Sequence, residues 1–410
     1  MRSPLGTWHG KVALIAGPNG PNTGIRRYVQ MLHLGLQQAG AETVRVTPAL
    51  PSFPDAAYRL LHIFGRDLRA FLTNYPLCSR YPQADLYHVT EQTLASLLLF
   101  CRPRGKVVVT VHDIFPYMVR NHSQLGSPYG AAEHAYYRLP MAGLKRADHL
   151  IAVSEYTRQC LVEHRGIAPE KISVVYNGID HERFRPLVVP AAIREKYGLP
   201  TGRRYLIYVG SEDPRKNLVA LVGALAQLRR ELSNVELIKV GRAHFELERQ
   251  RLLNLAAQLG IRTAIHFLED VPDDDLPMLY NLADLCVMPS LYEGFGFPVL
   301  EALACGIPVA YAKAGSLPEI VRDAGVQVFP CDADNLTSTL LAMLKRKQNR
   351  VSMQRNGERH AASFTWAKTI EGTAAVYKKL LQSESEDVAM TADADPKMQT
   401  QDPDPAIAKR

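Results

Sequence analysis

The sequence contains few cysteines and none of the spacings that bind zinc. Its six cysteines form no CxxC pair, and several lie inside apolar runs, so we expect buried thiols of a reducing compartment rather than disulfides or a metal site. No apolar run approaches the roughly 20 residues of a membrane-spanning helix. The first ten residues are polar and do not resemble a signal peptide. These absences predict a cytoplasmic protein.

Signatures of several function classes are also missing. The chain has no helix-turn-helix, RNA-binding or zinc-finger pattern, so nucleic acid is not an expected partner. It has neither a G-x-S-x-G nucleophile elbow nor the G-x-G-x-x-G fingerprint of dinucleotide-binding domains. The formal net charge is +7, and the residues from Ser383 onward are acidic, so the rest of the chain is more basic still. A basic body favours anionic ligands such as nucleotide phosphates or lipid headgroups.

The order of apolar runs predicts two domains of the same kind. A chain of 410 residues is too long for one ordinary core, and short strands that alternate with helical segments are typical of parallel βαβ units. We predict an α/β fold of two doubly wound, Rossmann-like domains that face each other across a cleft, with ligands at the carboxyl ends of the strands. The predicted strands are 12–16, 43–46, 85–89, 106–111, 149–153 and 171–176, then 205–209, 235–240, 264–267, 285–288, 308–310 and 326–329.

Changes in composition suggest the boundaries. The turn at Asn177-Gly178 and the prolines after it indicate a linker. We assign residues 1–183 to the first domain and 184–365 to the second. A final amphipathic helix is predicted over 366–382, and the acidic tail 383–410 loses apolar periodicity and is predicted to be disordered.

The most informative segment begins at Glu293 and ends at Glu301, with the sequence EGFGFPVLE. It follows a predicted buried strand and leads into a predicted helix. Its glycines let the backbone turn sharply and approach a ligand, and Pro298 suits the first turn of a helix. A helix N-terminus that faces a cleft is a ready anion site. The segment therefore suits a ligand with hydroxyl groups on both sides of a diphosphate, although an ordinary strand–turn–helix corner would look similar.

A pair of adjacent cations follows the first strand of the second half. Arg215 and Lys216 precede a predicted helix, where the helix dipole prefers anions. This arrangement is unfavourable unless an anion offsets it, and a diphosphate fits that requirement. A solvated basic turn is the alternative.

Two further features are weaker. The loop before Gly24 joins the first strand to the first helix, so the Gly24 N–H could approach a phosphate, or the loop could be a plain turn. His112 ends a predicted strand and could contact a sugar hydroxyl or the leaving phosphate, but a lone histidine there is more often structural.

Two other patterns are better accounted for by ordinary structure. The acidic run 273–275 resembles a metal site but precedes a helical segment, so helix capping is the favoured interpretation. The stretch 58–72 places Arg59, Arg66 and Arg69 near helical spacing opposite apolar residues. It could lie on an anionic membrane surface, but a surface helix packed on the first sheet is favoured.

Taken together, these residues resemble the family 4 retaining glycosyltransferases of the GT-B fold, also called glycosyl transferases group 1. The resemblance runs from about Val12 to Leu381, and its most specific part is the E-x7-E motif from Glu293 to Glu301. The segments 208–217, 147–155, 175–180, 279–284, 305–309 and 315–320 also resemble family sequence. The helix from Trp366 resembles the one that crosses back onto the N-terminal domain in this fold.

The resemblance implies an acceptor-binding first domain and a second domain that binds a nucleotide sugar. Glu293 would face the donor sugar near its 3-hydroxyl, Glu301 would bind the ribose hydroxyls, and Arg215 and Lys216 would hold the diphosphate. One residue departs from the pattern: Ser211 stands where some members have an additional arginine. The remaining implied contacts are Gly24 with the diphosphate, His112 with the sugar, the backbone near Phe267 and Leu268 with the base, and Phe295, Gly296 and Phe297 around the donor.

We therefore expect a metal-independent, retaining enzyme without a cofactor. It would move a hexose such as mannose or glucose from a nucleotide diphosphate sugar to a glycan or lipid-linked acceptor, in polysaccharide or glycolipid biosynthesis. For localisation, we expect a cytoplasmic protein that could contact the inner face of a membrane peripherally. A sugar-nucleotide epimerase and a non-catalytic nucleotide-sugar-binding protein are the alternatives.

Overall fold

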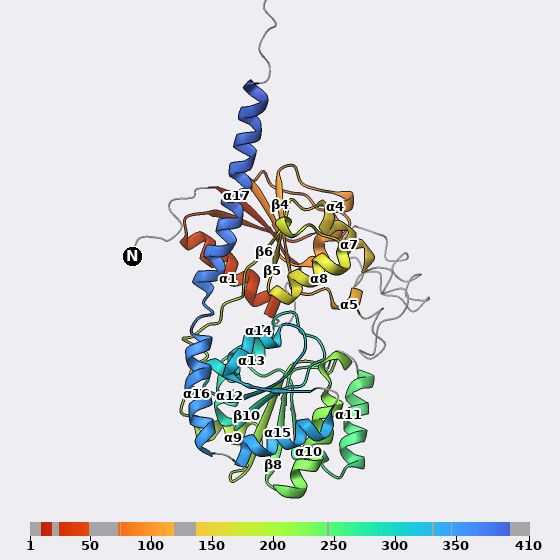
Figure 1. The fold of residues 1–410 in the computed structure, drawn as a ribbon, viewed down its shortest axis with the longest axis vertical. Coiled ribbons are helices and arrows are strands. Elements are labelled where there is room, and N and C mark those ends of the chain that lie inside the picture. Colours follow the sequence, from red (N-terminus) through yellow and green to blue (C-terminus); the bar gives the residue numbers. More distant parts are fainter. Residues whose placement is uncertain are drawn as a thin grey trace, which may run out of the picture.

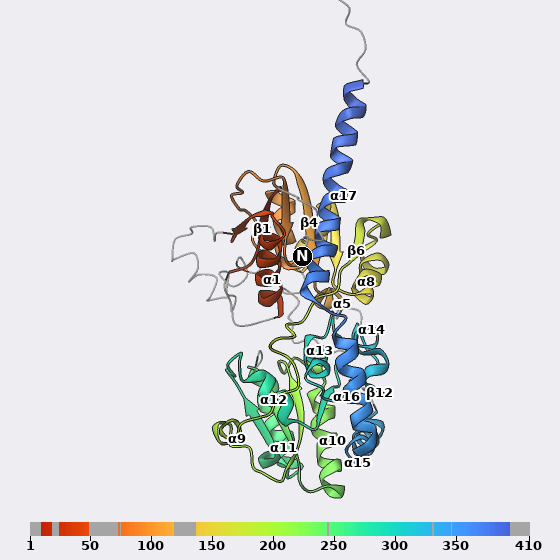
Figure 2. The ribbon, with the colours of Figure 1, turned by 90° about the vertical axis from the view of Figure 1, so that its left-hand side faces the viewer.

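The chain forms two parallel β-sheets, each of six strands, stacked along the long axis of the molecule (Figures 1 and 2). The structure is a computed structural model, and it describes residues 10–18, 24–48, 73, 75–118, 137–243, 246–329, 332–345 and 347–393. The basic stretch 58–72 and the loop before Gly24 lie outside these residues. The predicted architecture of two doubly wound sheets is confirmed.

The first sheet has the strand order β2-β1-β3-β4-β5-β6. Its strands run parallel, and their buried faces are rich in valine, leucine and isoleucine, as expected when helices cover both sides. The strand bounds are β1 (Lys11–Ile15), β2 (Glu42–Val46), β3 (Leu86–Val89), β4 (Lys106–Val111), β5 (His149–Ala152) and β6 (Ile172–Val174).

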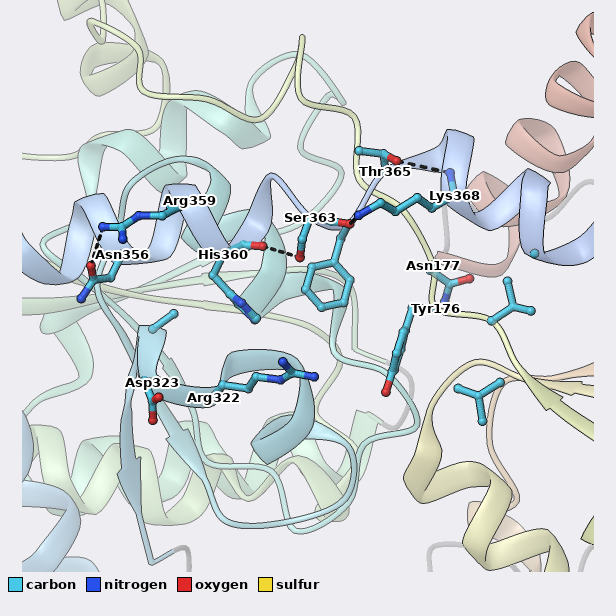
Figure 3. Close-up of a pocket in the computed structure, with 15 residues that line it drawn as sticks. Tyr176, Asn177, Arg322, Asp323, Asn356, Arg359, His360, Ser363, Thr365 and Lys368 are labelled. Atoms are coloured by element: carbon cyan, nitrogen blue, oxygen red, sulfur yellow. Dashed lines mark hydrogen bonds between the residues drawn. The ribbon is translucent and has the colours of Figure 1, made fainter. Parts of the chain in front are cut away.

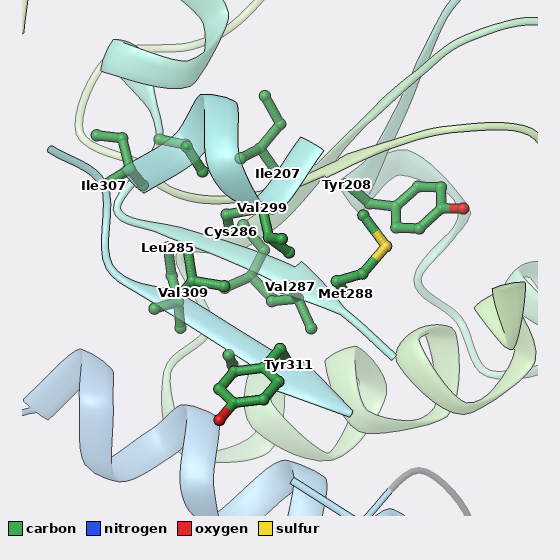
Figure 4. Packing of buried hydrophobic residues seen from close by; sticks show 14 of the residues in the cluster. Ile207, Tyr208, Leu285, Cys286, Val287, Met288, Val299, Ile307, Val309 and Tyr311 are labelled. Atoms are coloured by element: carbon green, nitrogen blue, oxygen red, sulfur yellow. The ribbon is translucent and has the colours of Figure 1, made fainter. Parts of the chain in front are cut away.

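The second sheet has the order β12-β11-β10-β7-β8-β9. Figure 4 shows its central part, where Cys286 and Val287 of β10 are both fully buried among apolar side chains that include Val299 and Val309. The strand bounds are β7 (Arg204–Val209), β8 (Val235–Val240), β9 (Ile265–Leu268), β10 (Leu285–Met288), β11 (Val309–Ala312) and β12 (Val326–Val328).

Helices connect the strands and cover the two sheets. Ser154 caps α8 as expected from sequence, because its hydroxyl accepts a hydrogen bond from Thr157 N at 3.1 Å. The helix bounds are α1 (Gly24–Gln38), α4 (Leu97–Phe100), α5 (Phe115–Met118), α7 (Arg138–Gly143), α8 (Glu155–Arg165), α9 (Ala191–Lys196), α10 (Leu218–Glu231), α11 (Glu246–Gln258), α12 (Leu276–Leu282), α13 (Phe297–Ala304), α14 (Leu317–Val321), α15 (Ala333–Lys345), α16 (Lys347–Ala361) and α17 (Trp366–Asp393).

The last helix returns to the first sheet. Figure 1 shows α16 beside the second sheet and α17 beside the first, with the end of α17 projecting past the body. Trp366, Ile370 and Tyr377 of α17 are buried against Leu14 and Tyr28. The predicted crossover helix is therefore confirmed.

Two sequence interpretations need correction. The helix does not end at residue 382 but continues to Asp393, because glutamate and alanine favour helix and extending an existing helix is easy. Of the acidic run 273–275, Asp275 occupies the N-cap position of α12, but its side chain makes no capping bond there with any described residue. Its carboxylate instead pairs with Lys196 at 2.5 Å and accepts a hydrogen bond from Tyr197 OH at 2.5 Å.

Metal-binding clusters and membrane-spanning helices are both absent from the described part of the chain. No group of histidine, cysteine and acidic side chains there could hold a metal ion. No helix in the same residues has the length and apolar character needed to cross a membrane.

A buried polar network fixes α17 to the first sheet. Tyr377 OH lies 2.5 Å from His88 Nδ1, and His88 Nε2 lies 2.7 Å from Thr110 Oγ1. Burial lowers the pKa of His88 to about 3, so the ring is neutral. Such a ring needs a partner at each nitrogen, because an unpaired buried polar atom is costly.

We predict that Tyr377→Phe lowers the free energy of unfolding by about 2 kcal/mol, because it leaves His88 Nδ1 buried without a partner. Urea denaturation followed by circular dichroism measures this change. The matched control is Tyr205→Phe, whose hydroxyl donates at 2.7 Å to the carbonyl oxygen of Pro200, an exposed residue. Water can replace that bond, so the control is expected to change stability by less than about 1 kcal/mol. Equal effects of the two variants would contradict the prediction.

Candidate active site between the two sheets

The segment from Glu293 to Glu301 lies where the carboxyl ends of the two sheets meet. It leaves β10 and begins α13 through Gly296, which has a φ of 100°. That left-handed conformation is readily available to glycine. Pro298 occupies the first turn of α13, as predicted. The local sequence thus turns the chain sharply from a buried strand into a helix at the interface.

The Glu293 carboxylate is buried in a set of polar contacts. Its Oε1 accepts hydrogen bonds from Lys216 Nζ at 2.5 Å and from Ser290 Oγ at 2.9 Å. Arg215 Nη1 lies 3.9 Å from its other oxygen. Burial alone raises the pKa of Glu293, but the attraction of Lys216 and Arg215 outweighs it and holds the pKa below its ordinary value. Glu293 is therefore ionised at neutral pH.

A neighbouring loop fixes the backbone of this segment. Ser316 donates to Glu293 O through its backbone N at 3.0 Å and through Oγ at 3.1 Å, and its Oγ also lies 2.9 Å from Phe295 O. Gly315 has a φ of 57°, and a Cβ there would collide with the Glu293 backbone. Contacts to the side chain and contacts to the backbone thus both hold Glu293 in place.

The cations of the 215–216 pair already have carboxylate partners. Arg215 Nε lies 3.5 Å from Asp213 Oδ2, its Nη1 donates to Tyr292 O at 3.3 Å, and its guanidinium lies 4.9 Å from the centre of the Phe115 ring. Lys216 pairs with Glu293. The prediction that only an anionic ligand could offset these cations is therefore wrong, because Asp213 and Glu293 do so within the chain.

The first sheet closes directly onto this segment. A Cβ at Gly294 would collide with the carbonyl oxygen of His112, so the two halves approach this closely only with glycine there. Ser154 Oγ and Thr157 Oγ1 of the first half donate to Gly294 O at 2.7 and 3.3 Å. The predicted proximity of His112 to the Glu293–Glu301 segment is thus seen in the structure.

His112 has a defined protonation pattern. Its Nε2 lies 3.0 Å from Thr90 O, so that nitrogen donates. Burial lowers the pKa of His112, which favours the neutral ring, and Nδ1 is then an acceptor. Tyr28 packs edge-on against the ring with centroids 5.0 Å apart. The histidine can therefore accept a hydrogen bond from a hydroxyl group.

Glu301 pairs with a residue from the opposite half that sequence reasoning missed. Arg27 of α1 donates to Glu301 Oε1 at 2.5 Å, and Tyr280 OH donates to Oε2 at 2.9 Å. Arg27 also lies over the Phe184 ring, 5.5 Å from its centre. A signal was available, because Arg26 and Arg27 lie in the first turn of a predicted helix, where cations oppose the helix dipole.

Gly24 begins α1 and faces the aromatic part of the motif. A Cβ on Gly24 would lie 2.8 Å from Cδ2 of Phe297. Phe297 in turn packs against Phe295 with ring centres 5.1 Å apart, and against Trp366 at 6.4 Å. The glycine is therefore explained by packing between the two halves, and its contact with a phosphate stays a prediction.

Phe267 and Leu268 lie farther along the second sheet, on its edge strand β9. The Phe267 ring is contacted by the guanidinium groups of Arg249 at 4.6 Å and Arg262 at 5.4 Å. Leu268 O accepts a hydrogen bond from Gly241 N at 2.8 Å. These residues share the carboxyl edge of the sheet with Arg215 and Lys216, separated from β7 by strand β8.

A second residue that sequence reasoning missed, Glu319, also joins the halves. Glu319 of α14 accepts hydrogen bonds from the backbone N atoms of Glu155 and Tyr156, each at 2.9 Å, and from Tyr176 OH at 2.9 Å. The first two donors belong to the N-terminus of α8, where a negative charge is stabilising. Glu319 therefore ties the second half to the first beside the candidate site.

Comparison with known proteins agrees with the geometry. Residues 22–183 match the family model described as Glycosyltransferase Family 4, and residues 190–360 match Glycosyl transferases group 1. The chain is 35% identical over 244 residues to a D-inositol 3-phosphate glycosyltransferase of Salinispora arenicola, a match covering 56% of this chain and 54% of that protein. It is 29% identical over 294 residues to the serotype-specific mannosyltransferase WbdA of Escherichia coli, covering 70% and 35%. The chain thus spans about half or less of these curated relatives.

Solved structures show the same fold. Sucrose-phosphate synthase from Thermosynechococcus elongatus superposes with a TM-score of 0.70 at 22% identity, covering 91% of this chain and 99% of that one. HepE from Anabaena, solved in complex with UDP and glucose, gives a TM-score of 0.68 at 21% identity, covering 91% and 100%. These likenesses establish the GT-B arrangement of the two sheets.

We predict that Glu293→Gln lowers stability by about 3 kcal/mol at pH 7, because it leaves Lys216 buried without a counter-charge. A carboxyl group whose folded pKa is lowered contributes in full above its unfolded value of 4.5, and the contribution is lost as pH falls through the folded pKa. The difference between wild type and variant should therefore shrink below pH 4.5 in urea denaturation. The exposed Glu231, 3.7 Å from Lys345, gives the control Glu231→Gln, expected to be nearly neutral. A difference that stays constant as pH falls well below 4.5 would show that the ionised carboxylate is not its source.

Proposed function

The chain belongs to the glycosyltransferases that these two family models describe, and we propose that it transfers a hexose, such as mannose or glucose, from a nucleotide diphosphate sugar to a glycan or lipid-linked acceptor. The observation that carries the proposal is the buried Glu293 carboxylate, held by Lys216 beside Arg215 where both sheets end. A nucleotide sugar as donor agrees with the UDP and glucose bound by HepE. The hexose agrees with the mannosyltransferase relatives.

The donor diphosphate would lie against Arg215 and Lys216. Both side chains are engaged by carboxylates in this structure, but arginine has five N–H donors and lysine three. Each can keep its carboxylate contact and still donate to a phosphate oxygen. The start of α1 at Gly24 is the proposed opposite wall. Charge-assisted bonds from two cations would bind the diphosphate firmly.

The ribose would bind at Glu301. An ionised carboxylate has about four lone-pair positions, and Arg27 and Tyr280 each use one oxygen of Glu301. The remaining positions can accept from two ribose hydroxyls. Arg27 and Tyr280 then act as positioning residues, since they fix the carboxylate before the nucleotide arrives.

The donor sugar would contact Glu293 and His112. Because the pKa of Glu293 is lowered, its carboxylate holds no proton at neutral pH and does not serve as a general acid. It can accept a hydrogen bond from a sugar hydroxyl instead. The neutral His112 ring offers a second acceptor at Nδ1. Two acceptors on facing walls would fix the orientation of the sugar.

Transfer breaks the bond between the anomeric carbon and the diphosphate oxygen and forms a bond from that carbon to an acceptor hydroxyl oxygen. The electron pair of the broken bond leaves on the diphosphate, where Arg215 and Lys216 would stabilise the growing charge. The acceptor oxygen bonds to the anomeric carbon on the face from which the diphosphate leaves, and this retains the anomeric configuration. The acceptor proton passes to the leaving phosphate on the same face. The chain's own cations thus supply the charge that a metal ion would otherwise supply.

The acceptor is proposed to bind the half that contains residues 1–183. Contact of the basic stretch 58–72 with an anionic membrane surface, and a place at the inner face of a membrane, belong to the same proposal and rest on sequence alone. The base would meet the backbone near Phe267 and Leu268.

We predict that a panel of nucleotide diphosphate sugars, screened by thermal shift, contains at least one that stabilises the protein and supports transfer to a glycan or lipid-linked acceptor. Two variants test the site residues. Glu293→Ala should lower the transfer rate by about 100-fold or more while the nucleoside diphosphate still binds. Lys216→Ala should weaken nucleoside diphosphate binding by about tenfold, because a charge-assisted bond is lost.

The exposed Lys145 provides the control Lys145→Ala, which should leave both quantities unchanged. Unchanged turnover in Glu293→Ala would refute the role of that carboxylate. Donor binding without turnover in the wild type would favour a non-catalytic nucleotide-sugar-binding protein instead, and turnover of the donor without an acceptor would favour an epimerase.

We further predict that Arg27→Ala weakens binding of a ribonucleoside diphosphate by about fivefold to tenfold, because Glu301 loses the contact that orients it. The 2′-deoxy analogue, which lacks one of the hydroxyl donors, should lose less affinity in the same variant. Calorimetry with both ligands measures the difference. Arg26→Ala, at the adjacent exposed position, is the matched control. Equal losses for the two ligands would contradict a role of Arg27 in ribose binding.

A further inference from the structure

A separate pocket opens between the two halves where the chain passes from one to the other. It has a volume of about 740 Å³. Its walls come from the end of the first half, from the turn after α14, and from the junction of α16 and α17 (Figure 3). None of Glu293, Arg215, Lys216 and His112 lines it. The pocket is therefore distinct from the proposed donor site.

Three cations line this pocket and are bonded there to neutral groups. Arg322 Nε donates to Glu319 O at 3.2 Å, Arg359 Nη2 to Asn356 Oδ1 at 3.0 Å, and Lys368 Nζ to Ser363 O at 3.0 Å. Among the described residues that line the pocket, Asp323 is the one acidic side chain. Figure 3 shows Arg359 and Lys368 on the wall formed by α16 and α17, and Arg322 on the turn after α14. The pocket therefore carries an excess of positive charge.

The backbone at Arg322 is strained. Its φ is 49° and its ψ is −133°, a positive-φ conformation outside the left-handed helical region that residues other than glycine seldom adopt. Strain of this kind persists only where the surroundings impose it, and it is frequent at binding sites. Tyr311 OH donates to Arg322 O at 3.2 Å and helps to hold the turn. The structure thus maintains an unfavourable backbone at a pocket-lining arginine.

A buried amide on the opposite wall points to a ligand independently. Asn177 is only 1% exposed. Within the described residues, neither its Nδ2 nor its Oδ1 has a hydrogen-bond partner. Buried amide groups are nearly always paired, and an exception calls for a cause such as a missing ligand or water. Asn177 lines the pocket, so an occupant with hydroxyl groups could both donate to it and accept from it.

The two chain segments beside the pocket, at residues 178–179 and 364–366, pack closely against each other. Ile179 N donates to Phe364 O at 3.2 Å, and Ile179 pairs with Thr365 in an isolated bridge. A Cβ at Gly178 would collide with the backbone of Trp366. The walls that carry Asn177 and Lys368 are thus fixed relative to each other, as a binding site requires.

We infer that this pocket binds a small phosphorylated metabolite, a phosphomonoester on a body rich in hydroxyl groups. Three cations and one carboxylate leave a net charge that a phosphate dianion balances, since a phosphomonoester carries about −1.5 to −2 at pH 7. The volume is much larger than a phosphate ion and lies within the roughly 300–1,000 Å³ usual for small-molecule sites. Asn177, Asn356 and the hydroxyl of Tyr176 supply hydrogen-bonding groups for the body of the ligand.

The experiment is calorimetry on the full chain with hexose 6-phosphates, compared with the free hexoses and inorganic phosphate. Wild type should bind a hexose phosphate more tightly than either comparator. The triple variant Arg322→Gln, Arg359→Gln, Lys368→Gln should weaken that binding by about tenfold or more, because charge-assisted hydrogen bonds are lost. Asn177→Ala should weaken hexose phosphate but leave inorganic phosphate unchanged.

Two controls distinguish binding in this pocket from general charge attraction and from binding at the donor site. A second triple variant, Arg104→Gln, Lys145→Gln, Arg230→Gln, removes the same charge at exposed positions outside the pocket and should bind like wild type. Lys216→Ala tests the donor site and should also bind hexose phosphate normally. The inference is overturned if wild type binds no hexose phosphate at millimolar concentration, if both triple variants lose binding equally, or if Lys216→Ala alone abolishes it.

Discussion

The absence of a side chain at residue 294 is the constraint on which the interface depends. A Cβ there would collide with His112 O, so the two sheets could not meet as closely with any other residue. Once they meet, Gly294 O receives the hydroxyl groups of Ser154 and Thr157. Glu319 reaches the N-terminus of α8 from the same side. One small residue therefore allows a set of polar contacts that define the cleft.

The two glutamates of the motif share a physical pattern but differ in their partners. Each is buried, and each carboxylate is balanced by a cation: Glu293 by Lys216 from its own half, and Glu301 by Arg27 from the opposite half. Burying a charge without a partner is strongly unfavourable. The pairs therefore hold both carboxylates in fixed orientations, which is the preorganisation that electrostatic catalysis needs. Only the Glu301 pair also depends on the closeness of the two halves.

Sequence patterns predicted those structural features that depend on residues close together in the chain. The strands Lys106–Val111, Val235–Val240 and Leu285–Met288 have the bounds read from their apolar runs, because a parallel strand buried on both faces is continuously apolar. The contacts Arg27–Glu301 and Glu319–α8 join residues far apart in the chain, and periodicity does not encode such pairs. The same limit applies to Arg215 and Lys216: the sequence showed the unusual cations but not the carboxylates that face them.

The charges around the N-termini of α8 and α13 favour one of these two helices as the place where a donor diphosphate would bind. The N-terminus of α8 is already occupied, because Ser154 caps it and Glu319 accepts from Glu155 N and Tyr156 N. The first turn of α13 contains no acidic residue, and no side chain among the described residues caps its N-terminus. Its positive end follows Glu293 in the chain, and the Glu293 carboxylate contacts Lys216 and lies 3.9 Å from Arg215 Nη1. A diphosphate at α13 would therefore meet a helix dipole and two cations together, whereas at α8 it would have to displace a carboxylate.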